Sequence, residues 1–350
     1  MRHPLYFPSW LKPEIIPGLP VRWYGLMYIF AFATAFFVFK KQVKERRFPM
    51  TEDNMYSVFL WGIVGLVLGA RIFYCLVYDT PGYFVLHPWM IFWPFQDGHF
   101  TGLAGMSYHG GVIGGLLGFG LYSLRKKWDL REVTDLFCTA IPLGYSWGRL
   151  GNFINGELYG RVTASPIGMV FPHAEKFSAR IPQVREIAEQ TGIPIPSPDA
   201  MLNLPRYPSQ LMELIFEGIV CWAILWAIRK YKPFKGFQGG AYVIIYGIFR
   251  FFIEYFREPD RHLGYRIQFG EQVPISEIAW LHPIGSLSTG QILCFGMILV
   301  GLIWWTCCLA FPNARPVVYV YPEKGEEKKL SQSEKDDAKK NRRKLRKKLK

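Results

Sequence analysis

The sequence predicts an all-α integral membrane protein, a bundle of about seven transmembrane helices with a small irregular head on the outer side. Three observations lead to this prediction. Half of the 350 residues are hydrophobic and 17% are aromatic, and the apolar residues cluster into long uncharged blocks. Basic residues gather in every second connection between these blocks. One long connection is rich in proline and turn residues.

Seven apolar blocks are candidates for membrane spans. In chain order they cover residues 23–39, 56–70 with an extension past Arg71, 110–124, 137–154, 211–228, 241–256 and 291–311. A bilayer core about 30 Å thick needs roughly 20 predominantly apolar residues in a helix, so the shorter blocks span it only by including polar flanking residues. Buried helices of a large soluble protein are the alternative interpretation.

The distribution of lysine and arginine predicts the orientation. The connections after the first, third and fifth blocks contain five, four and four basic residues, and the tail beyond Phe311 contains fourteen, whereas residues 79–108 contain none. Because cytoplasmic connections carry the excess of basic residues, the N-terminus is expected outside and the C-terminus inside. The net charge of +14 then reflects topology and a tail beside anionic lipid, and nucleic-acid binding is not favoured.

Two units follow from this pattern. Residues 1–311 are expected to form the transmembrane domain, with the head inserted at about 156–210. Residues 312–350 are expected to form a basic cytoplasmic tail that is disordered or lies along lipid phosphates. The first block resembles a signal peptide, but the basic cluster that follows it indicates a retained span.

Three arginines fall within or at the ends of apolar blocks: Arg71, Arg149 and Arg250. Insertion of an arginine at a helix centre costs about 2.5 to 3.5 kcal/mol, so each needs a compensating partner. Around the third, Tyr246, Arg250, Glu254 and Arg257 are spaced to share one narrow stripe of a helix. An ion-pair ladder that only anchors the helix is the alternative, but one glutamate leaves positive charge over.

The segment GRLGNFINGELYGR, residues 148–161, ends the fourth block with a polar cluster. Arg149 and Asn152 lie one helical turn apart, and Asn155 follows at the expected helix end. The glycines reduce bulk, so a ligand or another backbone can approach closely. Because the planar guanidinium group donates paired hydrogen bonds to phosphate, the segment predicts an anion site rather than an ordinary helix cap.

Two further residues are placed at the outer ends of helices. His109 precedes a glycine-rich stretch, and its imidazole is suited to act as a general base near neutral pH, although such a histidine is more often an ordinary interfacial residue. Tyr24 is either an aromatic-belt residue or part of the site. The topology puts six polar residues at one depth in the outer half of the membrane, which favours a site for an anionic phospholipid headgroup: Tyr24, His109, Asn152, Glu157, Glu254 and Arg257.

GRLGNFINGELYGR resembles the signature of the bacterial prolipoprotein diacylglyceryl transferases. The resemblance extends to RWYGLMY near the start, SYHGGVIGG in the third block, PSQLMEL before the fifth and YGIFRFFIEYFREPD in the sixth, in family order. It implies a seven-span enzyme of the bacterial inner membrane. Such enzymes move the diacylglyceryl group of phosphatidylglycerol onto the lipobox cysteine thiol of a preprolipoprotein, forming a thioether and releasing glycerol phosphate.

The resemblance also implies roles for residues. Arg149 and Arg250 would hold the phosphate, with Arg257 beside them. The headgroup pocket would be shaped by Asn152, Asn155, Glu157 and Gly160, and activity would further depend on Tyr24, His109, Tyr246 and Glu254. No metal and no cofactor is required. A flippase for an anionic lipid and a non-catalytic scaffold with structural ion pairs are the competing interpretations. Tyr207 and Met212 depart from the residues most common in the family.

Overall fold

The structure is a computed structural model. It describes residues 4–16, 22–78, 81–96, 99–100, 105–258, 264–268, 273–274, 277–280, 285–311 and 313–314. The predicted basic tail therefore lies outside the described residues, apart from residues 313–314.

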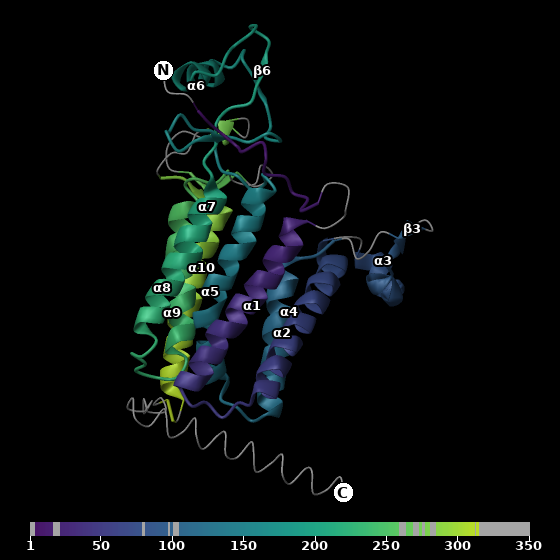
Figure 1. The fold of residues 1–350 in the computed structure, drawn as a ribbon, viewed down its shortest axis with the longest axis vertical. Coiled ribbons are helices and arrows are strands. Elements are labelled where there is room, and N and C mark those ends of the chain that lie inside the picture. The colour runs from purple at the N-terminus through teal and green to yellow at the C-terminus, as the bar shows by residue number, and fades with distance from the viewer. Residues whose placement is uncertain are drawn as a thin grey trace, which may run out of the picture.

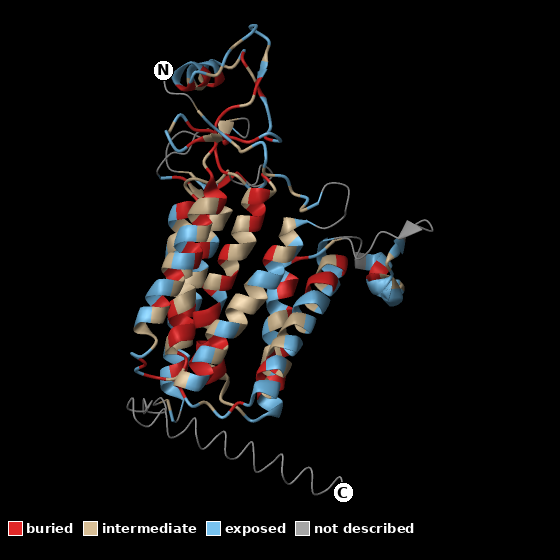
Figure 2. Cartoon of the chain, viewed as in Figure 1, coloured by how far each residue is buried: buried red, intermediate tan, exposed pale blue. Residues whose placement is uncertain are grey.

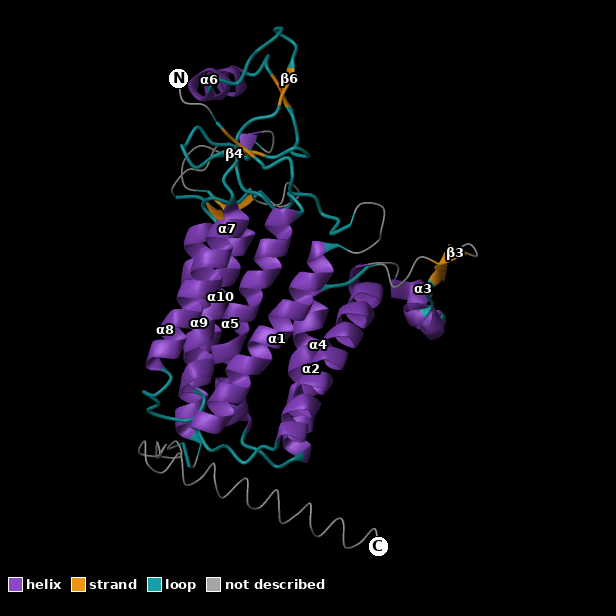
Figure 3. Ribbon diagram, in the orientation of Figure 1, coloured by secondary structure: helices purple, strands orange, loops and turns teal. Residues whose placement is uncertain are grey.

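The described part of the chain is mostly helical, with short paired strands (Figures 1 and 3). The helices are α1 (Trp23–Glu45), α2 (Glu52–Phe73) with a π-helical continuation at Tyr74–Tyr78, α3 (Pro81–Leu86), a 3-10 turn at Pro88–Phe92, α4 (Tyr108–Arg125), α5 (Leu130–Ile154), α6 (Pro182–Thr191), α7 (Ser209–Glu213), a π-helical segment at Leu214–Val220, α8 (Cys221–Ile228), α9 (Phe237–Ile253) and α10 (Thr289–Ala310). The strands are β1 (Leu5–Tyr6), β2 (Phe95–Gln96), β3 (His99–Phe100), β4 (Met169–Val170), β5 (Phe177–Ser178), β6 (Met201–Leu202), β7 (Tyr265–Ile267) and β8 (Leu287–Ser288). β1 pairs with β4 in parallel, whereas β2–β3, β5–β6 and β7–β8 are antiparallel pairs.

Each predicted apolar block coincides with helical structure, and four helical stretches of the described residues are long and apolar enough to cross a bilayer. These are Trp23–Glu45, Glu52–Tyr78, Ser209–Ile228 and Thr289–Ala310, and α9 is a shorter apolar helix. The sixth block ends earlier than predicted. α9 stops at Ile253, and the chain then turns so that the carbonyl of Phe256 accepts a hydrogen bond from Arg161 N at 2.9 Å.

The outward faces of these helices are apolar. Exposed leucines run along α2, α4 and α10, among them Leu60, Leu117 and Leu299, while buried residues face the interior of the bundle (Figure 2). Soluble proteins rarely expose contiguous apolar surface of this extent. The helices therefore present their outer faces to lipid, and the chain is a membrane protein.

Glycines hold α2 and α4 in close contact. Gly65 and Gly69 of α2 face Gly110, Gly114 and Gly118 of α4, and a Cβ built on Gly114 would lie 2.1 Å from the carbonyl oxygen of Gly65. Small residues let helix backbones approach closely in membranes, where packing replaces the hydrophobic effect as the main attraction. The α2–α4 pair is thus fixed by backbone contact along its length.

Replacing Gly114 by alanine should lower the thermal unfolding midpoint in detergent. The added methyl group meets backbone atoms, which cannot rotate away, and overpacking of this kind costs about 1 to 3 kcal/mol. Gly120→Ala in the same helix is the matched control, because nothing lies within 4 Å of its Cβ position. Its midpoint should stay the same or rise, and equal losses in both variants would contradict the close contact.

α5 is the central helix of the bundle and packs against α1, α9 and α7–α8 (Figure 1). Its lower part also fixes the start of α9. Asp135, fully buried, accepts hydrogen bonds from Gly236 N at 2.9 Å and Gly239 N at 3.0 Å, and Lys232 Nζ lies 3.0 Å from the same carboxylate. Since α9 carries Arg250, this anchor helps set the height of that arginine relative to α5.

Residues between α5 and α7 fold into a head above the bundle (Figure 1). The head has its own apolar core, which includes Val162, Phe177, Val184, Leu202 and Leu204. It is joined to the end of α9 by the backbone contact between Arg161 and Phe256 and by Arg206, whose Nη1 lies 2.5 Å from Glu258 Oε2. The head is therefore fastened directly above the polar ends of α5 and α9.

Candidate anion site

The last turns of α5 carry the polar segment that the sequence singled out. The helix continues to Ile154, as predicted, and Asn155 is its C-cap. Arg149 Nη1 lies 3.4 Å from the side-chain oxygen of Asn152. Asn152 and Asn155 both donate to Glu157 Oε1, at 3.1 Å and 3.2 Å. The end of α5 is therefore one hydrogen-bonded polar unit.

Arg149 and Arg250 meet on a single carboxylate. Arg149 Nε lies 2.7 Å from Glu213 Oε2, and Arg250 Nη1 lies 2.9 Å from Glu213 Oε1. Arg257 adds a third contact, with Nη1 2.5 Å from Glu213 Oε1. Side chains from α5, α7 and α9 thus converge on one point of the bundle.

Two more glutamates complete this arginine cluster, which we define as Arg149, Arg250, Arg257, Glu213, Glu217 and Glu254. Arg250 lies 2.9 Å from Glu254 and 3.7 Å from Glu217. Arg257 Nε lies 3.5 Å from Glu254, which also accepts a hydrogen bond from Ser288 at 3.1 Å. The cluster pairs three cations with three carboxylates.

This charge balance corrects the sequence interpretation. The stripe of Tyr246, Arg250, Glu254 and Arg257 was expected to lie on one helix and to leave positive charge over. Arg257 instead lies beyond the end of α9, because the chain turns after Ile253 toward the head. Glu213 and Glu217 supply the missing negative charge. Sequence reasoning missed both, although an acidic pair spaced i, i+4 inside an apolar block was a usable signal.

The acidic and basic side chains of the cluster differ in how far they are exposed. The side chains of Glu213 and Glu217 are 0% exposed, whereas those of Arg149, Arg250 and Arg257 are 18%, 17% and 21% exposed. The two carboxylates are therefore enclosed, whereas the three guanidinium groups keep some contact with the surroundings. Fixed guanidinium donors that are partly exposed are suited to bind an anion or to stabilise negative charge that develops during a reaction.

Two tyrosines line the cluster. Tyr145 is one turn before Arg149, and its hydroxyl accepts a hydrogen bond from Arg149 Nε at 2.5 Å and donates one to Glu217 at 2.5 Å. Tyr246, predicted from the sequence, packs edge-on against Tyr145 with ring centroids 6.0 Å apart. Tyr145 was not predicted. Its ring, 4.9 Å from the guanidinium carbon of Arg149, restricts the orientation of that side chain.

The side chains of His109 and Tyr24, both predicted from the sequence, make their contacts outside the arginine cluster. Nδ1 of His109 lies 3.2 Å from the hydroxyl of Tyr78, at the end of the α2 continuation. Tyr24 has its hydroxyl 3.3 Å from that of Tyr28, and its ring packs on Gly151 of the α5 segment.

The glycines of the α5 segment have separate roles. Gly156, with φ of +64°, allows the chain to turn at the end of α5. Gly160 lets the head approach α9, because a Cβ there would lie 2.1 Å from the carbonyl oxygen of Phe256. Gly148, by contrast, has nothing within 4 Å of its Cβ position. Only the first two are required by the backbone.

Gly160→Ala should therefore destabilise the protein by about 1 to 3 kcal/mol, since the methyl group can be accommodated only if the head shifts from α9. Thermal unfolding in detergent measures this loss. Gly148→Ala, in the same segment, should unfold at the wild-type temperature or slightly above, because alanine favours the helix. A Gly160→Ala protein as stable as the wild type would contradict the tight contact.

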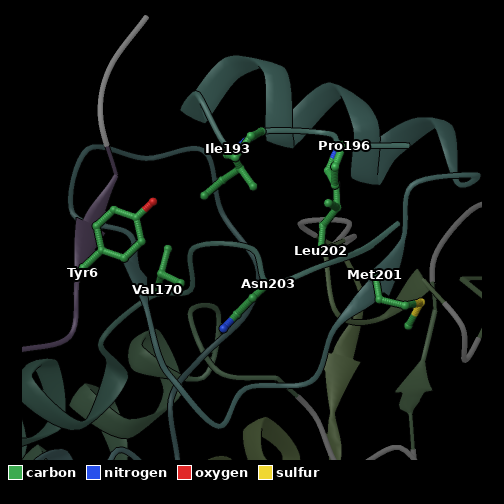
Figure 4. Close-up of a pocket in the computed structure, with 8 residues that line it drawn as sticks. Tyr6, Val170, Ile193, Pro196, Met201, Leu202 and Asn203 are labelled. Atoms are coloured by element: carbon green, nitrogen blue, oxygen red, sulfur yellow. The ribbon is translucent and has the colours of Figure 1, made fainter. Parts of the chain in front are cut away.

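A separate cavity of about 330 Å³ lies in the head (Figure 4). Tyr6 of β1, Ile193 and Pro196 after α6, and Met201 and Asn203 at β6 line it. None of the cluster residues is among its lining residues. The cavity is therefore distinct from the arginine cluster.

Comparison with known proteins places the chain in a family. The family model for prolipoprotein diacylglyceryl transferase matches residues 13–307. The chain is 50% identical over 342 residues to phosphatidylglycerol–prolipoprotein diacylglyceryl transferase of Treponema denticola, covering 93% of this chain and 97% of that protein. It is 47% identical to the same-named protein of Treponema pallidum over 313 residues, covering 85% and 93%. With the one of Chlorobaculum tepidum it shares 40% over 308 residues, covering 85% and 91%. This chain belongs to the prolipoprotein diacylglyceryl transferase family.

Proposed function

We propose that this chain transfers the diacylglyceryl group of phosphatidylglycerol to the thiol of the lipobox cysteine in a preprolipoprotein, the first step of lipoprotein maturation. The product is a thioether, and glycerol phosphate is released. The observation that carries the proposal is the arginine cluster, in which partly exposed guanidinium groups contact a buried carboxylate, in a chain 50% identical to a relative named for this reaction.

The proposed topology is seven spans in the bacterial inner membrane. The alternation of basic and non-basic connections supports a periplasmic N-terminus and head, with the basic tail in the cytoplasm. The helices that contain the seven apolar blocks support the span count. In this orientation the arginine cluster lies toward the periplasmic end of the bundle, and phosphatidylglycerol reaches it from the outer leaflet.

The reaction displaces a phosphate from carbon. The cysteine sulfur attacks the glycerol carbon that carries the phosphodiester, the C–S bond forms, and the C–O bond breaks with its electron pair going to the phosphate oxygen. Glycerol phosphate therefore leaves with one more negative charge than the phosphate had in the lipid. Arg149 and Arg250 stabilise that charge in a low-dielectric site, where a fixed donor is typically worth about 2.7 to 4 kcal/mol.

Arg149 has a donor available for this task. Within the described residues its contacts use Nε and Nη1, which leaves Nη2 for the phosphate. Glu213 and Tyr145 fix the group in position before substrate arrives. The headgroup pocket is completed by Asn152, Asn155, Glu157, Gly160 and Arg257, and Glu254 and Tyr246 hold Arg250 and Tyr145 in place.

The thiol must lose its proton, because the thiolate is the nucleophile. We assign this proton to His109, whose ring is oriented by the hydroxyl of Tyr78 at 3.2 Å. Tyr24 supports the site by packing on Gly151 of the α5 segment. The reaction as written needs no metal ion and no cofactor.

The proposal is tested with purified protein in detergent, phosphatidylglycerol and a lipobox peptide. Glycerol phosphate should be released in a one-to-one ratio with thioether-linked peptide. A peptide with serine in place of the lipobox cysteine is the control and should give neither product. Folded protein that releases no glycerol phosphate would overturn the proposed reaction.

A further inference from the structure

The start of α10 lies directly against the arginine cluster. Ser288 is the N-cap of this helix and is 1% exposed. Its Oγ donates a hydrogen bond to Glu254 Oε1 at 3.1 Å and accepts one from Gln291 N at 3.2 Å, while the Gln291 side chain accepts one from Ser288 N at 3.0 Å. One buried hydroxyl therefore both caps α10 and binds a carboxylate of the cluster.

Gly290, in the first turn of α10, leaves the space that this carboxylate occupies. A Cβ built on Gly290 would lie 2.4 Å from Glu254 Oε1 and 2.7 Å from Glu254 Cδ. The backbone of Gly290 is helical, and its φ is not positive. Glycine is required here because the helix and the carboxylate approach closely, and not because of the backbone conformation.

The two carboxylate oxygens of Glu254 face different partners. Oε1 is bound from α10, whereas Oε2 lies 2.9 Å from Arg250 Nη2 and 3.5 Å from Arg257 Nε. The other terminal nitrogen of Arg250, Nη1, is held by Glu213 of α7 at 2.9 Å. The guanidinium group of Arg250 is thus held on two sides, and α10 fixes the carboxylate on one of them.

α10 supports this contact firmly, because it is fastened along its length. It runs beside α9 (Figure 1), and β8, which contains Ser288, pairs with β7 in the chain between the two helices. Near the other end of α10, two indole N–H groups donate to carbonyls at the start of α9 at 2.8 and 2.9 Å: Trp304 to Gly236 and Trp305 to Phe237. A slide of α10 along α9 would break these hydrogen bonds, so the position of Ser288 relative to Glu254 is fixed.

We propose that Ser288 and Gly290 are positioning residues of the reaction, which act through Glu254 on the direction of the Arg250 guanidinium group. Neither residue needs to touch the lipid. Fixed donors stabilise developing charge best when they are oriented before the reaction starts, and a misplacement of 1 Å can lower a rate by about 10²-fold. The inference rests on the proposed function for the identity of the anion.

Gly290→Ala tests the close approach. The methyl group displaces the Glu254 carboxylate and Arg250 with it, so kcat for glycerol phosphate release should fall by about 10²-fold, with a smaller change in KM for phosphatidylglycerol. Gly296→Ala in the same helix is the matched control, because nothing lies within 4 Å of its Cβ position, and it should keep the wild-type kcat. A Gly290→Ala protein with wild-type kcat would overturn the inference.

Ser288→Gly tests the hydrogen bond without adding bulk. Glycine is a good N-cap, so α10 should remain folded, but it cannot donate to Glu254. The kcat should fall by about tenfold, and Ser288→Thr, which keeps the hydroxyl, should restore most of the loss. Thr51→Gly removes the N-cap hydroxyl of α2, a helix outside the cluster, and should leave kcat unchanged. Equal losses in Ser288→Gly and Thr51→Gly would contradict the inference, because capping alone would then account for them.

A readout that needs no turnover separates this inference from the proposed function. Phenylglyoxal modifies guanidinium groups, and mass spectrometry of the digested protein gives the rate of modification at each arginine. In Gly290→Ala and Ser288→Gly the rate at Arg250 should rise several-fold, while the rate at Arg180 in the head stays the same.

The two proposals can therefore fail separately. Wild-type protein that releases no glycerol phosphate, together with faster modification of Arg250 in the variants, would refute the proposed function and leave the hold of α10 on Arg250 standing. Unchanged modification of Arg250 in both variants, each shown to be folded by thermal unfolding, would overturn the inference whatever the wild-type turnover.

Discussion

Turnover should fall by about 10²- to 10³-fold when Arg149 is replaced by alanine, the loss typical of removing one fixed donor from developing negative charge. Arg149 supplies the partly exposed guanidinium group of α5, held by Tyr145 and Glu213. The fold should survive, because Glu213 keeps Arg250 at 2.9 Å and Arg257 at 2.5 Å and is not left as an unpaired buried charge. Glycerol phosphate release and thermal unfolding in detergent measure the two effects separately.

Two substitutions sharpen this prediction. Arg149→Lys keeps the charge but loses the planar fork, so it should recover only part of the lost activity. Arg180→Ala removes an arginine whose side chain is 73% exposed and which pairs with Asp199 in the head, so it should have no effect on turnover. An Arg149→Lys protein with full activity would rule out paired hydrogen bonding as the function of this residue.

The helices were predictable because the bilayer restricts the choice. A span must be apolar over a minimum length, and the sequence shows this directly in blocks such as 23–39 and 291–311, which lie in α1 and α10. The partners of Arg71 were not predictable. They include the backbone carbonyls of Ile91 and Gly105, and a carbonyl acceptor leaves no mark in the sequence.

Part of the site was also predictable, because charged residues are rare in membrane spans. Arg149 and Arg250 stood out because each is a costly charge in an apolar block, and the structure brings both to one point. Glu213 and Glu217 lie inside the apolar block 211–228 and are equally costly, but the sequence does not show that they meet arginines from other helices. In the sequence, Tyr145 is indistinguishable from an aromatic residue that only packs between helices. Its contact with Arg149 is a local i, i+4 contact on α5, but its hydrogen bond to Glu217 depends on the position of the Leu214–Val220 segment, which local spacing does not reveal.

The role of Glu213 follows from its three partners. One fully buried carboxylate fixes the positions of Arg149, Arg250 and Arg257, at 2.7, 2.9 and 2.5 Å. Its negative charge also reduces the attraction of the cluster for phosphatidylglycerol, which is an anion before the reaction starts. Glu213 therefore lowers the affinity of the cluster for the lipid, but it fixes the positions of the donors that stabilise the leaving phosphate.

Glu213→Gln separates these two effects. The variant keeps most of the side-chain volume but leaves three guanidinium groups with two carboxylates, so kcat should fall by about 10²-fold while KM for phosphatidylglycerol stays the same or decreases. Removing one partner of a buried ion pair also costs about 3 to 5 kcal/mol, so the thermal unfolding midpoint should drop. Steady-state kinetics at a temperature where the variant is folded distinguishes the kinetic loss from unfolding.

Glu217→Gln tests whether the loss of kcat in Glu213→Gln comes from the position of Glu213 or only from the loss of one negative charge. It removes the same charge from the same helix, but Glu217 contacts Arg250 only at 3.7 Å, and its closest partner is Tyr145. Its kcat should fall less than that of Glu213→Gln. Equal losses would mean that the net charge of the cluster, and not the placement of the arginines by Glu213, governs turnover. A Glu213→Gln protein with normal kcat would show that the leaving phosphate does not depend on this arrangement, because all three arginines would then have lost their common partner without consequence.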